Sequence, residues 1–533
     1  HEQARAWAAE LAEIERALAA VANSRFARLA QIFGLSPADL DLLQACASLA
    51  WDPPLARVAA YLHDQASRAY LTESLAARLY GQGRSGLWPA ASALFGWELV
   101  RVRESDPGEP RALECDPQIR DWLRGHPVLD ASLAGFVRPQ PPRPPLTHWP
   151  VDACAGWLEQ VLRDDPSVRT RVILSGARGS GRRTFAAIVA AKLNLSLLVV
   201  DADPIVDADW RAVFLRAQRQ AFLTSCAVAW AGESMSRRHW PRHVVGFPVQ
   251  FVVCEPGQEP PPVAGLADYP LRLTVPEAAE RARLWRSYVP GTRAWTDAEV
   301  VALAARHRAQ PGDIAAVGRM GASTPAHAAQ AVRGLARGRL AALTQQLECP
   351  FTWDDLVVPA ATENLLKSIA YEAEQHPTFW EQPTPRRLFP QGQGLLALFS
   401  GHPGTGKTMA AQVIAAHLGQ DLFRVNLAQY VSKWVGETAK HCEQLLNQAA
   451  EMDAVLFFDE ADAIFAKRSA EMRDAQDRFA NTDAAYLLQA IESYRGVAFL
   501  ATNLKGNIDP AFFRRLRYVV EFAKPDAAHR RQL

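Results

Sequence analysis

The chain has 533 residues, enough for three or four domains at roughly 150 residues each. Apolar residues make up 49% and charged residues 22%, and 58 basic against 57 acidic side chains leave a net charge of +1, which argues against a protein that coats polyanions. No apolar run reaches the ~18–20 residues of a membrane span, and seven cysteines without CxxC spacing indicate neither a zinc site nor a disulfide framework. We therefore expect a cytoplasmic protein without a membrane partner.

Residues 1–138 are expected to form an α-rich, winged-helix-like domain. Apolar residues recur at helical spacing from Trp7 to Leu18, and Ser36 to Asp39 supplies a helix cap with a proline at the first helical position. Short apolar stretches on both sides of Ser105 to Gly108 predict a β-hairpin. The segment carries 14 Arg, no Lys and 17 acidic residues, a net charge of −3. Because duplex affinity depends on neutralising phosphates, nucleic acid is a poor partner here, and docking to protein is favoured.

An internal repeat follows a proline-dense linker at residues 139–150. Gly176 to Arg183 and Gly401 to Thr408 are glycine-rich loops 225 residues apart, each after an apolar strand. The same offset maps Ala190 to Leu193 onto Ala415 to Leu418, which indicates two copies of one α/β module. The expected domains are a first module at 151–270, its helical lid at 271–348, a second module at 349–523 and the start of a truncated second lid at 524–533.

The loop of the second module satisfies the pattern GxxxxGK[ST]. Glycines allow backbone N–H groups to turn toward phosphate oxygens, and the following helix adds positive potential at its N-terminus. Lys407 can reach the β- and γ-phosphates and Thr408 can ligate Mg²⁺. The sequence therefore predicts an ATP and Mg²⁺ site, and its expected nucleotide-binding residues are Gly401, His402, Pro403, Gly404, Thr405, Gly406, Lys407, Thr408 and Met409.

Carboxylates and an amide follow two further apolar strands of this module. Asp459 and Glu460 come directly after Val455 to Phe458, and Asn503 comes shortly after Val497 to Leu500. In a parallel sheet such strand ends lie beside the phosphate loop. We expect Asp459 to hold Mg²⁺ and Glu460 to act as the general base for the attacking water, with Asn503 orienting that water or the γ-phosphate.

An arginine group comes later in the chain and consists of Arg514, Arg515 and Arg517. The planar, permanently charged guanidinium suits the transition-state charge of a transferring phosphoryl group. The three are therefore candidates for an arginine finger, and the sequence does not choose among them.

The phrases GHPGTGKT, FFDEAD and ATN, followed by arginines after DPA, resemble the AAA branch of the AAA+ ATPases. The resemblance covers residues 351–533 with specific motifs and 150–345 more loosely. It implies two P-loop AAA+ modules, each a parallel sheet with helices on both faces and a helical lid. It also implies arginines acting on a neighbour's nucleotide within a homo-oligomeric ring, usually a hexamer. Lys433, Trp434 and Val435 stand where that family carries a pore loop that grips a protein substrate.

The first copy lacks these parts. Arg182 replaces the phosphate lysine, and Arg183 stands at the magnesium hydroxyl. Aligning its strands by their apolar runs places Gly232 at the magnesium aspartate, Glu233 at the general base and Glu255 at the sensor amide. We therefore expect a structural or ring-building module without hydrolysis.

The function expected is a ring motor that hydrolyses ATP to remodel or translocate a protein. The domain layout, with Asp116 to Trp122 and Phe351 to Leu356, resembles the AAA ATPases encoded with extracellular contractile injection systems, which are phage-tail-like particles. This resemblance implies cargo loading or particle assembly. Two alternatives stay open: a DNA-binding AAA+ switch that uses the winged-helix-like domain, and a scaffold that binds ATP without hydrolysing it.

Overall fold

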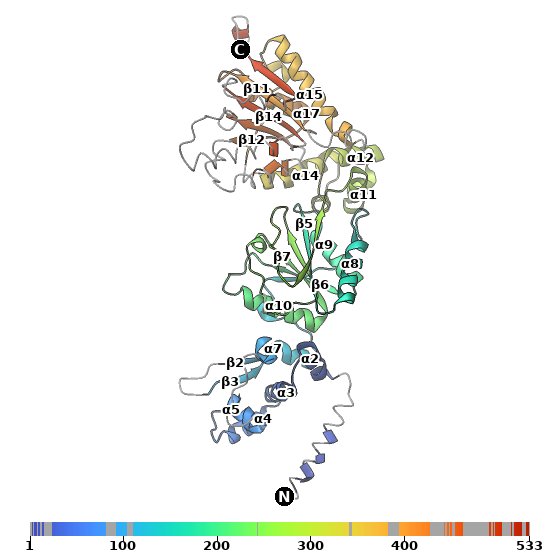
Figure 1. Cartoon of the computed structure of the whole chain (residues 1–533). Coiled ribbons are helices and arrows are strands. Elements are labelled where there is room, and N and C mark those ends of the chain that lie inside the picture. Colours follow the sequence, from blue (N-terminus) through green and yellow to red (C-terminus); the bar gives the residue numbers. More distant parts are fainter. Residues whose placement is uncertain are drawn as a thin grey trace, which may run out of the picture. The chain divides into compact units, whose positions relative to one another are not determined.

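The computed structural model contains an α-rich N-terminal region and two six-stranded sheets (Figure 1). It divides into two compact units, His1–Gly176 with Arg182–Leu273, and Ala177–Gly181 with Thr274–Leu533. No helix in the described part of the chain is long and apolar enough to cross a membrane. The structure describes residues 3, 5–7, 9–10, 13–14, 24–80, 92–103, 110–241, 244–340, 344–381, 394–426, 442, 445–446, 448–449, 454–461, 490–491, 494, 496–503, 513, 516–524 and 529–531.

The N-terminal region has the winged-helix-like arrangement that the sequence predicts. Its hairpin strands pair antiparallel, and a third strand completes a sheet in the order β1-β3-β2. The predicted cap is confirmed, because Ser36 and Asp39 form a reciprocal capping box at the start of a helix. The elements are α2 (Arg25–Phe33), α3 (Pro37–Trp51), α4 (Pro53–Leu62), β1 (Leu71–Thr72), α5 (Glu73–Leu79), α6 (Ala93–Gly96), β2 (Val100–Arg103), β3 (Ala112–Cys115) and α7 (Pro117–Leu123).

The first module is a sheet in the order β4-β6-β7-β8-β5-β9, parallel except for its antiparallel edge strand β4. Pro139, the first residue of the expected linker, is the last residue of β4. The elements are β4 (Val137–Pro139), α8 (Val151–Asp164), β5 (Arg169–Gly176), α9 (Arg182–Lys192), β6 (Ser196–Asp201), α10 (Trp210–Thr224), β7 (Cys226–Ala231), β8 (Val249–Cys254) and β9 (Leu266–Leu273).

The second module repeats this topology in the order β10-β12-β13-β14-β11-β15, again with an antiparallel first edge strand. Each strand has its counterpart at the same place in the first sheet, so the predicted duplication is confirmed. The elements are β10 (Gln345–Leu347), α15 (Ala360–Glu381), β11 (Leu395–Gly401), α17 (Lys407–Leu418), β12 (Leu422–Asn426), β13 (Val455–Asp459), β14 (Val497–Thr502) and β15 (Tyr518–Phe522).

A helical lid precedes β10 and packs within the same compact unit as the second module. Arg306 donates to the carbonyl of Leu418 at 2.6 Å, and Arg333 donates to that of Gly419 at 2.8 Å. Both bonds satisfy carbonyls at the C-terminus of α17, where cations are favoured. The lid therefore supports the helix that begins at the phosphate loop. Its helices are α11 (Ala278–Tyr288), α12 (Asp297–Arg306), α13 (Pro311–Arg319) and α14 (Pro325–Leu340).

The two faces of the second sheet bury different clusters. Val455 and Phe457 of β13 pack in a cluster that includes Val413 and Ile414 of α17, whereas Leu456 and Phe458 pack on the opposite side. Because side chains alternate along a strand, Asp459 shares the α17 face of the sheet. Asp459, the last residue of β13, is thus on the face of the sheet that α17 covers, the helix that follows the phosphate loop.

Candidate nucleotide-binding and hydrolysis site

The phosphate loop connects β11 to α17 and depends on its glycines. A Cβ atom on Gly401 would lie 2.4 Å from the carbonyl oxygen of Phe522, so that position has no room for a side chain. Gly404 and Gly406 have φ of 78° and 97°, a backbone region that side chains disfavour. Thr405 holds the turn by donating to the carbonyl of His402 at 2.8 Å. The loop can therefore present its backbone to a phosphate at the start of α17.

Lys407 joins the loop to the predicted sensor. Its ammonium lies 2.7 Å from the carbonyl oxygen of Gly401, 3.0 Å from that of His402 and 2.9 Å from Oδ1 of Asn503. Lys407 and Asn503 are 96 positions apart in the chain, and the fold brings them into contact. The three acceptors named here are neutral oxygen atoms.

The predicted carboxylates reach the same edge of the sheet. Asp459 ends β13 and Asn503 follows β14, which lies between β13 and the loop-bearing β11. Carboxyl ends of neighbouring parallel strands form the ligand-binding edge of such sheets. Glu460 is exposed and has φ of 57°, an uncommon conformation for a residue with a side chain. Such backbone conformations cluster at active sites.

Two oxygen donors suit Mg²⁺ at this edge. Asp459 offers a half-buried carboxylate, and Thr408 offers a hydroxyl in the first turn of α17. Mg²⁺ prefers hard oxygen ligands and is usually bound through one or two protein groups plus substrate phosphates. The donor set therefore fits this ion together with a nucleotide. Pro403 and Met409 complete the predicted loop residues, with Pro403 exposed and Met409 half-buried.

Sequence reasoning missed one residue at this edge. Arg424 of β12 forms an ion pair with Oδ2 of Asp459, while Oδ1 accepts from the backbone N–H of Glu460 at 3.0 Å. The alternation of side chains along the strand could have indicated this residue. Arg424 lies two residues before Asn426, the register partner of Asp459, so both are on the same face of the sheet.

Arg517 lies away from the phosphate loop. Its backbone N–H donates to Leu396 at 2.9 Å, at the amino end of β11, and its side chain pairs with Glu372 at 2.5 Å. From Leu396 to Gly401 a strand rises about 16 Å, so Arg517 sits at the opposite edge from the loop.

Burial and the Glu372 carboxylate raise the pKa of Tyr518 to about 12, so Tyr518 stays a neutral donor to that carboxylate.

Five further predicted residues lie outside the described part of the chain. They are Arg514, Arg515, Lys433, Trp434 and Val435.

Strand register corrects the alignment of the first module. Asp201 pairs with Ala231 as Asn426 pairs with Asp459, and Trp230 pairs with Val252 as Phe458 pairs with Leu500. The alignment by apolar runs was therefore wrong by one residue: Ala231 is the counterpart of Asp459, and Gly232 that of Glu460. Hydrogen-bond pairing sets register, whereas the end of an apolar run does not. Both carboxylates are thus missing at these positions.

Near the strand ends of the first module, two side chains form hydrogen bonds with backbone groups of the same module. Arg182 donates to the carbonyl oxygen of Cys254 at the end of β8. Asp203 accepts from the backbone N–H groups of Ser234 at 2.9 Å and Glu233 at 3.2 Å. A Cβ on Gly232 would lie 2.6 Å from this carboxylate.

The sensor position of the first module is as the sequence predicts. Ser175 pairs with Cys254 as Ser400 pairs with Thr502, so Glu255, the next residue, is the counterpart of Asn503.

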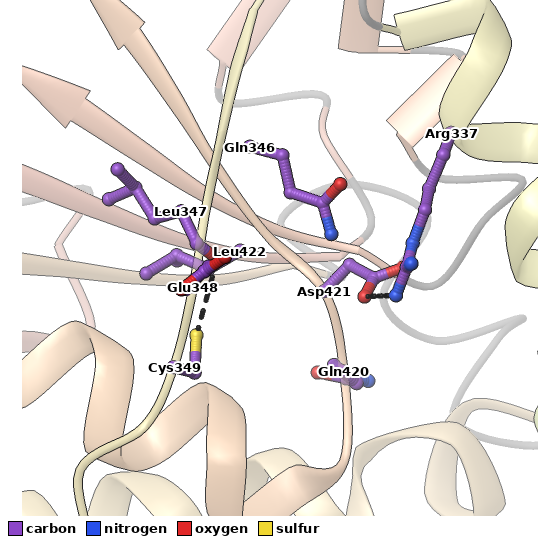
Figure 2. A pocket seen from close by; sticks show the side chains of 8 residues that line it. All are labelled: Arg337, Gln346, Leu347, Glu348, Cys349, Gln420, Asp421 and Leu422. Carbon is purple, nitrogen blue, oxygen red and sulfur yellow. Dashed lines mark hydrogen bonds and ion pairs between the residues drawn. The ribbon is translucent and has the colours of Figure 1, made fainter.

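A pocket of about 490 Å³ lies elsewhere in the second unit (Figure 2). Arg337 bridges it by donating to both carboxylate oxygens of Asp421, at 3.0 and 2.6 Å. The predicted site residues do not line this pocket, so it is separate from the candidate site at the strand ends. The lining residues are Arg337, Gln346, Leu347, Glu348, Cys349, Gln420, Asp421 and Leu422.

Comparison with known proteins adds two families and several relatives. Residues 397–525 match the ATPase family associated with various cellular activities (AAA), and residues 1–137 match the winged helix domain, variant. An uncharacterized AAA family ATPase y4kL of Sinorhizobium fredii is 41% identical over 135 residues, which cover 25% of this chain and 39% of that protein.

Two eukaryotic relatives match a similar share of the chain. Fidgetin-like protein 1 of Drosophila melanogaster is 32% identical over 170 residues, 31% of each chain. The 26S proteasome regulatory subunit 6B homolog of Encephalitozoon cuniculi is 34% identical over 149 residues, 27% of this chain and 37% of that protein. The chain thus spans less than half the length of each of these relatives. The second module, with its lysine, carboxylates and amide at one sheet edge, is therefore the part of the chain that is similar to AAA ATPases, and residues 1–137 are similar to the winged-helix domain.

Proposed function

We propose that this protein hydrolyses ATP at the second module alone and uses the reaction to remodel or translocate a protein substrate. The observation that carries the proposal is the 2.9 Å bond between Lys407 and Asn503, with Asp459 and Glu460 on the neighbouring strand end. The lysine proposed for the phosphates, the carboxylate proposed for the metal ion, the proposed base and the orienting amide thereby share one edge of one sheet.

Each of these residues has a distinct chemical task. Lys407 is proposed to bind the β- and γ-phosphates, and its contact with Asn503 supports a position of the amide near the γ-phosphate. Asp459 and Thr408 hold Mg²⁺, which neutralises charge that develops on the phosphates. The exposed carboxylate of Glu460 accepts the proton of the attacking water, a role typically worth 10²–10⁴ in rate. Asn503 orients that water without adding charge.

We infer that a homo-oligomeric ring, a hexamer by family resemblance, would complete the site. Arg517 occupies the sheet edge opposite its own phosphate loop, so it can meet a nucleotide only on another copy. Lys433, Trp434 and Val435 are proposed to line the channel of that ring, where an indole grips polypeptide by apolar contact. One relative is named as a proteasome regulatory subunit, which agrees with a protein substrate.

The finer assignment is cargo loading or assembly for a contractile injection particle. Its support is the order of parts in one chain: a winged-helix domain, a module whose strand ends lack the carboxylates, and a module that keeps them. The acidic balance of residues 1–138, 14 Arg against 17 Asp and Glu, supports docking to protein rather than to duplex DNA.

The proposal is tested by measuring ATP turnover and native mass in the full chain. We expect Glu460→Gln to lose at least ~100-fold in turnover and to retain ATP in a larger assembly. Trp434→Ala should keep turnover but lose processing of a protein substrate. The control with the same chemical change is Glu233→Gln, one residue after the counterpart of Glu460 in the first module, which should leave turnover unchanged. Equal turnover in wild type and Glu460→Gln would remove the base assignment, and phosphate release absent from the wild type would favour an ATP-binding scaffold.

A further inference from the structure

Arg424 and Asp459 form an ion pair at the edge that holds the proposed magnesium site. The arginine side chain is 38% exposed and the aspartate 23%, so both groups are partly withdrawn from water. Oδ1 of Asp459 is engaged by the backbone N–H of Glu460 at 3.0 Å, and Oδ2 by the guanidinium. Both oxygens that would serve a metal therefore have partners within the chain.

The backbone places this arginine on the side of the sheet that the phosphate loop uses. Arg424 precedes Asn426 by two residues, and Asn426 is the register partner of Asp459. Side chains two apart share a face, and Leu422 of the same strand packs in the cluster that contains α17. Arg424 thus lies on the same face of the sheet as Asp459 and α17.

The first module offers an internal control for this pairing. Ala229 pairs with Val199 as Phe457 pairs with Arg424, so Val199 is the counterpart of Arg424 and is buried among apolar residues. The module that has Ala231 in place of the aspartate thus also has no arginine at this position. Loss of the carboxylate and loss of the guanidinium go together, as expected if the arginine serves the carboxylate.

We propose that Arg424 is a displaceable counter-ion of Asp459 that competes with Mg²⁺ and so sets the magnesium concentration at which nucleotide binds. This inference rests on the proposed function of the same site. The guanidinium holds Oδ2 and a backbone N–H holds Oδ1, so a metal ion at this carboxylate would lie beside the guanidinium, and two cations held side by side repel each other. The ion pair stabilises the carboxylate while the metal is absent, and the metal must break it to bind.

A purely structural role makes the opposite prediction. If Arg424 held the carboxylate in the geometry that the metal needs, its removal would weaken metal binding. If it acts as a competitor, its removal strengthens the response to Mg²⁺ and leaves an uncompensated carboxylate beside the phosphates when Mg²⁺ is absent. The sign of the change in magnesium dependence therefore separates the two roles.

The experiment measures equilibrium binding of ATP as a function of Mg²⁺ in the full chain with Glu460→Gln, which suppresses turnover. Adding Arg424→Ser should lower the half-saturating Mg²⁺ concentration about three- to tenfold, the scale of a partly exposed ion pair plus relief of repulsion. In EDTA the same variant should bind ATP more weakly. Arg424→Lys, which keeps the charge, should stay close to the parent protein.

The matched control is Arg337→Ala, which removes an arginine–aspartate pair of the same unit that lies at the pocket of Figure 2. It should leave the magnesium dependence unchanged. An unchanged or raised half-saturating Mg²⁺ for Arg424→Ser would overturn the inference, and Arg424→Gln repeats the test should the serine variant fail to fold. A parent protein that binds no ATP at saturating Mg²⁺ would instead overturn the proposed function.

Discussion

The two modules have one topology and different strand ends. Both sheets run in the same order, with an antiparallel first edge strand and the phosphate loop after the equivalent strand. The second module ends β13 in Asp459 and Glu460, whereas the first ends β7 in Ala231 and Gly232. Because the loss of both carboxylates leaves the sheet intact, the fold does not depend on its chemistry.

The first module differs in a second way: its helix α10 makes buried contacts with the N-terminal domain. Arg219 is fully buried and pairs with Asp130 at 2.7 Å and Asp116 at 3.2 Å. It also donates to the backbone carbonyls of Trp97 and Glu98. Since these groups lie inside one compact unit, the first module anchors the N-terminal domain, whereas catalysis is the role proposed for the second module.

The sharpest way to break this comparison is to change the same loop position in both modules. Lys407→Ala should reduce ATP turnover by at least ~100-fold, because it removes the cation at the β- and γ-phosphates. Arg182→Ala should leave turnover within about twofold. The first module has neither a carboxylate for a metal ion nor a general base at the corresponding strand end. Phosphate release by the two variants measures this difference. A large loss in Arg182→Ala would mean that the first module takes part in hydrolysis.

The anchoring role predicts a large stability effect in the first unit. Arg219→Met takes a buried cation from Asp130 and Asp116, of which Asp116 keeps its ion pair with Arg101, and breaking such buried pairs typically costs 3–5 kcal/mol. Thermal unfolding followed by circular dichroism should show the loss, with ATP turnover of the folded fraction retained. Arg216→Met is the matched control on the same helix, because the Arg216–Glu98 pair is partly exposed and should cost about 1 kcal/mol or less. Equal losses of stability in Arg219→Met and Arg216→Met would contradict the anchoring role of Arg219.

Acid should act on the second unit through the lid. Burial, with repulsion from Arg306 and Arg333, lowers the pKa of His307 to about 4. Folding therefore favours the neutral imidazole. The stability it contributes is fully present above pH 6.5 and is lost as pH falls toward 4, an effect of roughly 2–3 kcal/mol.

Urea unfolding at pH 7.5 and pH 5 tests this prediction on the transition of the second unit. His307→Gln should flatten the pH dependence between those values. An equally steep dependence in the variant would assign the acid response to other groups.

The smallest effects concern the residues after β7 and β13, and they should have opposite signs. Gly232→Ala places a Cβ 2.6 Å from the Asp203 carboxylate at a φ of 138°, which should destabilise the first module by about 1–2 kcal/mol. Glu460→Gly relieves a left-handed conformation and should stabilise the second module by up to about 1 kcal/mol while abolishing turnover. Chemical denaturation measures both. A loss of stability in Glu460→Gly would mean that its side chain holds the turn.

Local patterns in the sequence were sufficient to predict the phosphate loop and the strand ends of the second module. Gly401 to Thr408 is a continuous segment whose glycines, lysine and threonine have tasks fixed by short-range geometry, and Asp459 follows its strand directly. Contact of Lys407 with Asn503 then follows from the order of parallel strands. The loop and the strand ends need only the chain direction and the pleat, whereas the contact also needs the order of the strands in the sheet.

Other features required the tertiary structure. The register that puts Ala231 opposite Asp201 comes from interstrand hydrogen bonds, and an apolar run can slide by one residue without losing its pattern. The pairing of Arg424 with Asp459 and the place of Arg517 at the far edge arise between segments distant in sequence.

The sequence by itself thus determined which module has the lysine, carboxylates and amide of the proposed site, because these residues sit in contiguous motifs. The tertiary structure decided which charges meet, because ion pairs such as Arg219 with Asp130 form only when separate elements pack and exclude water.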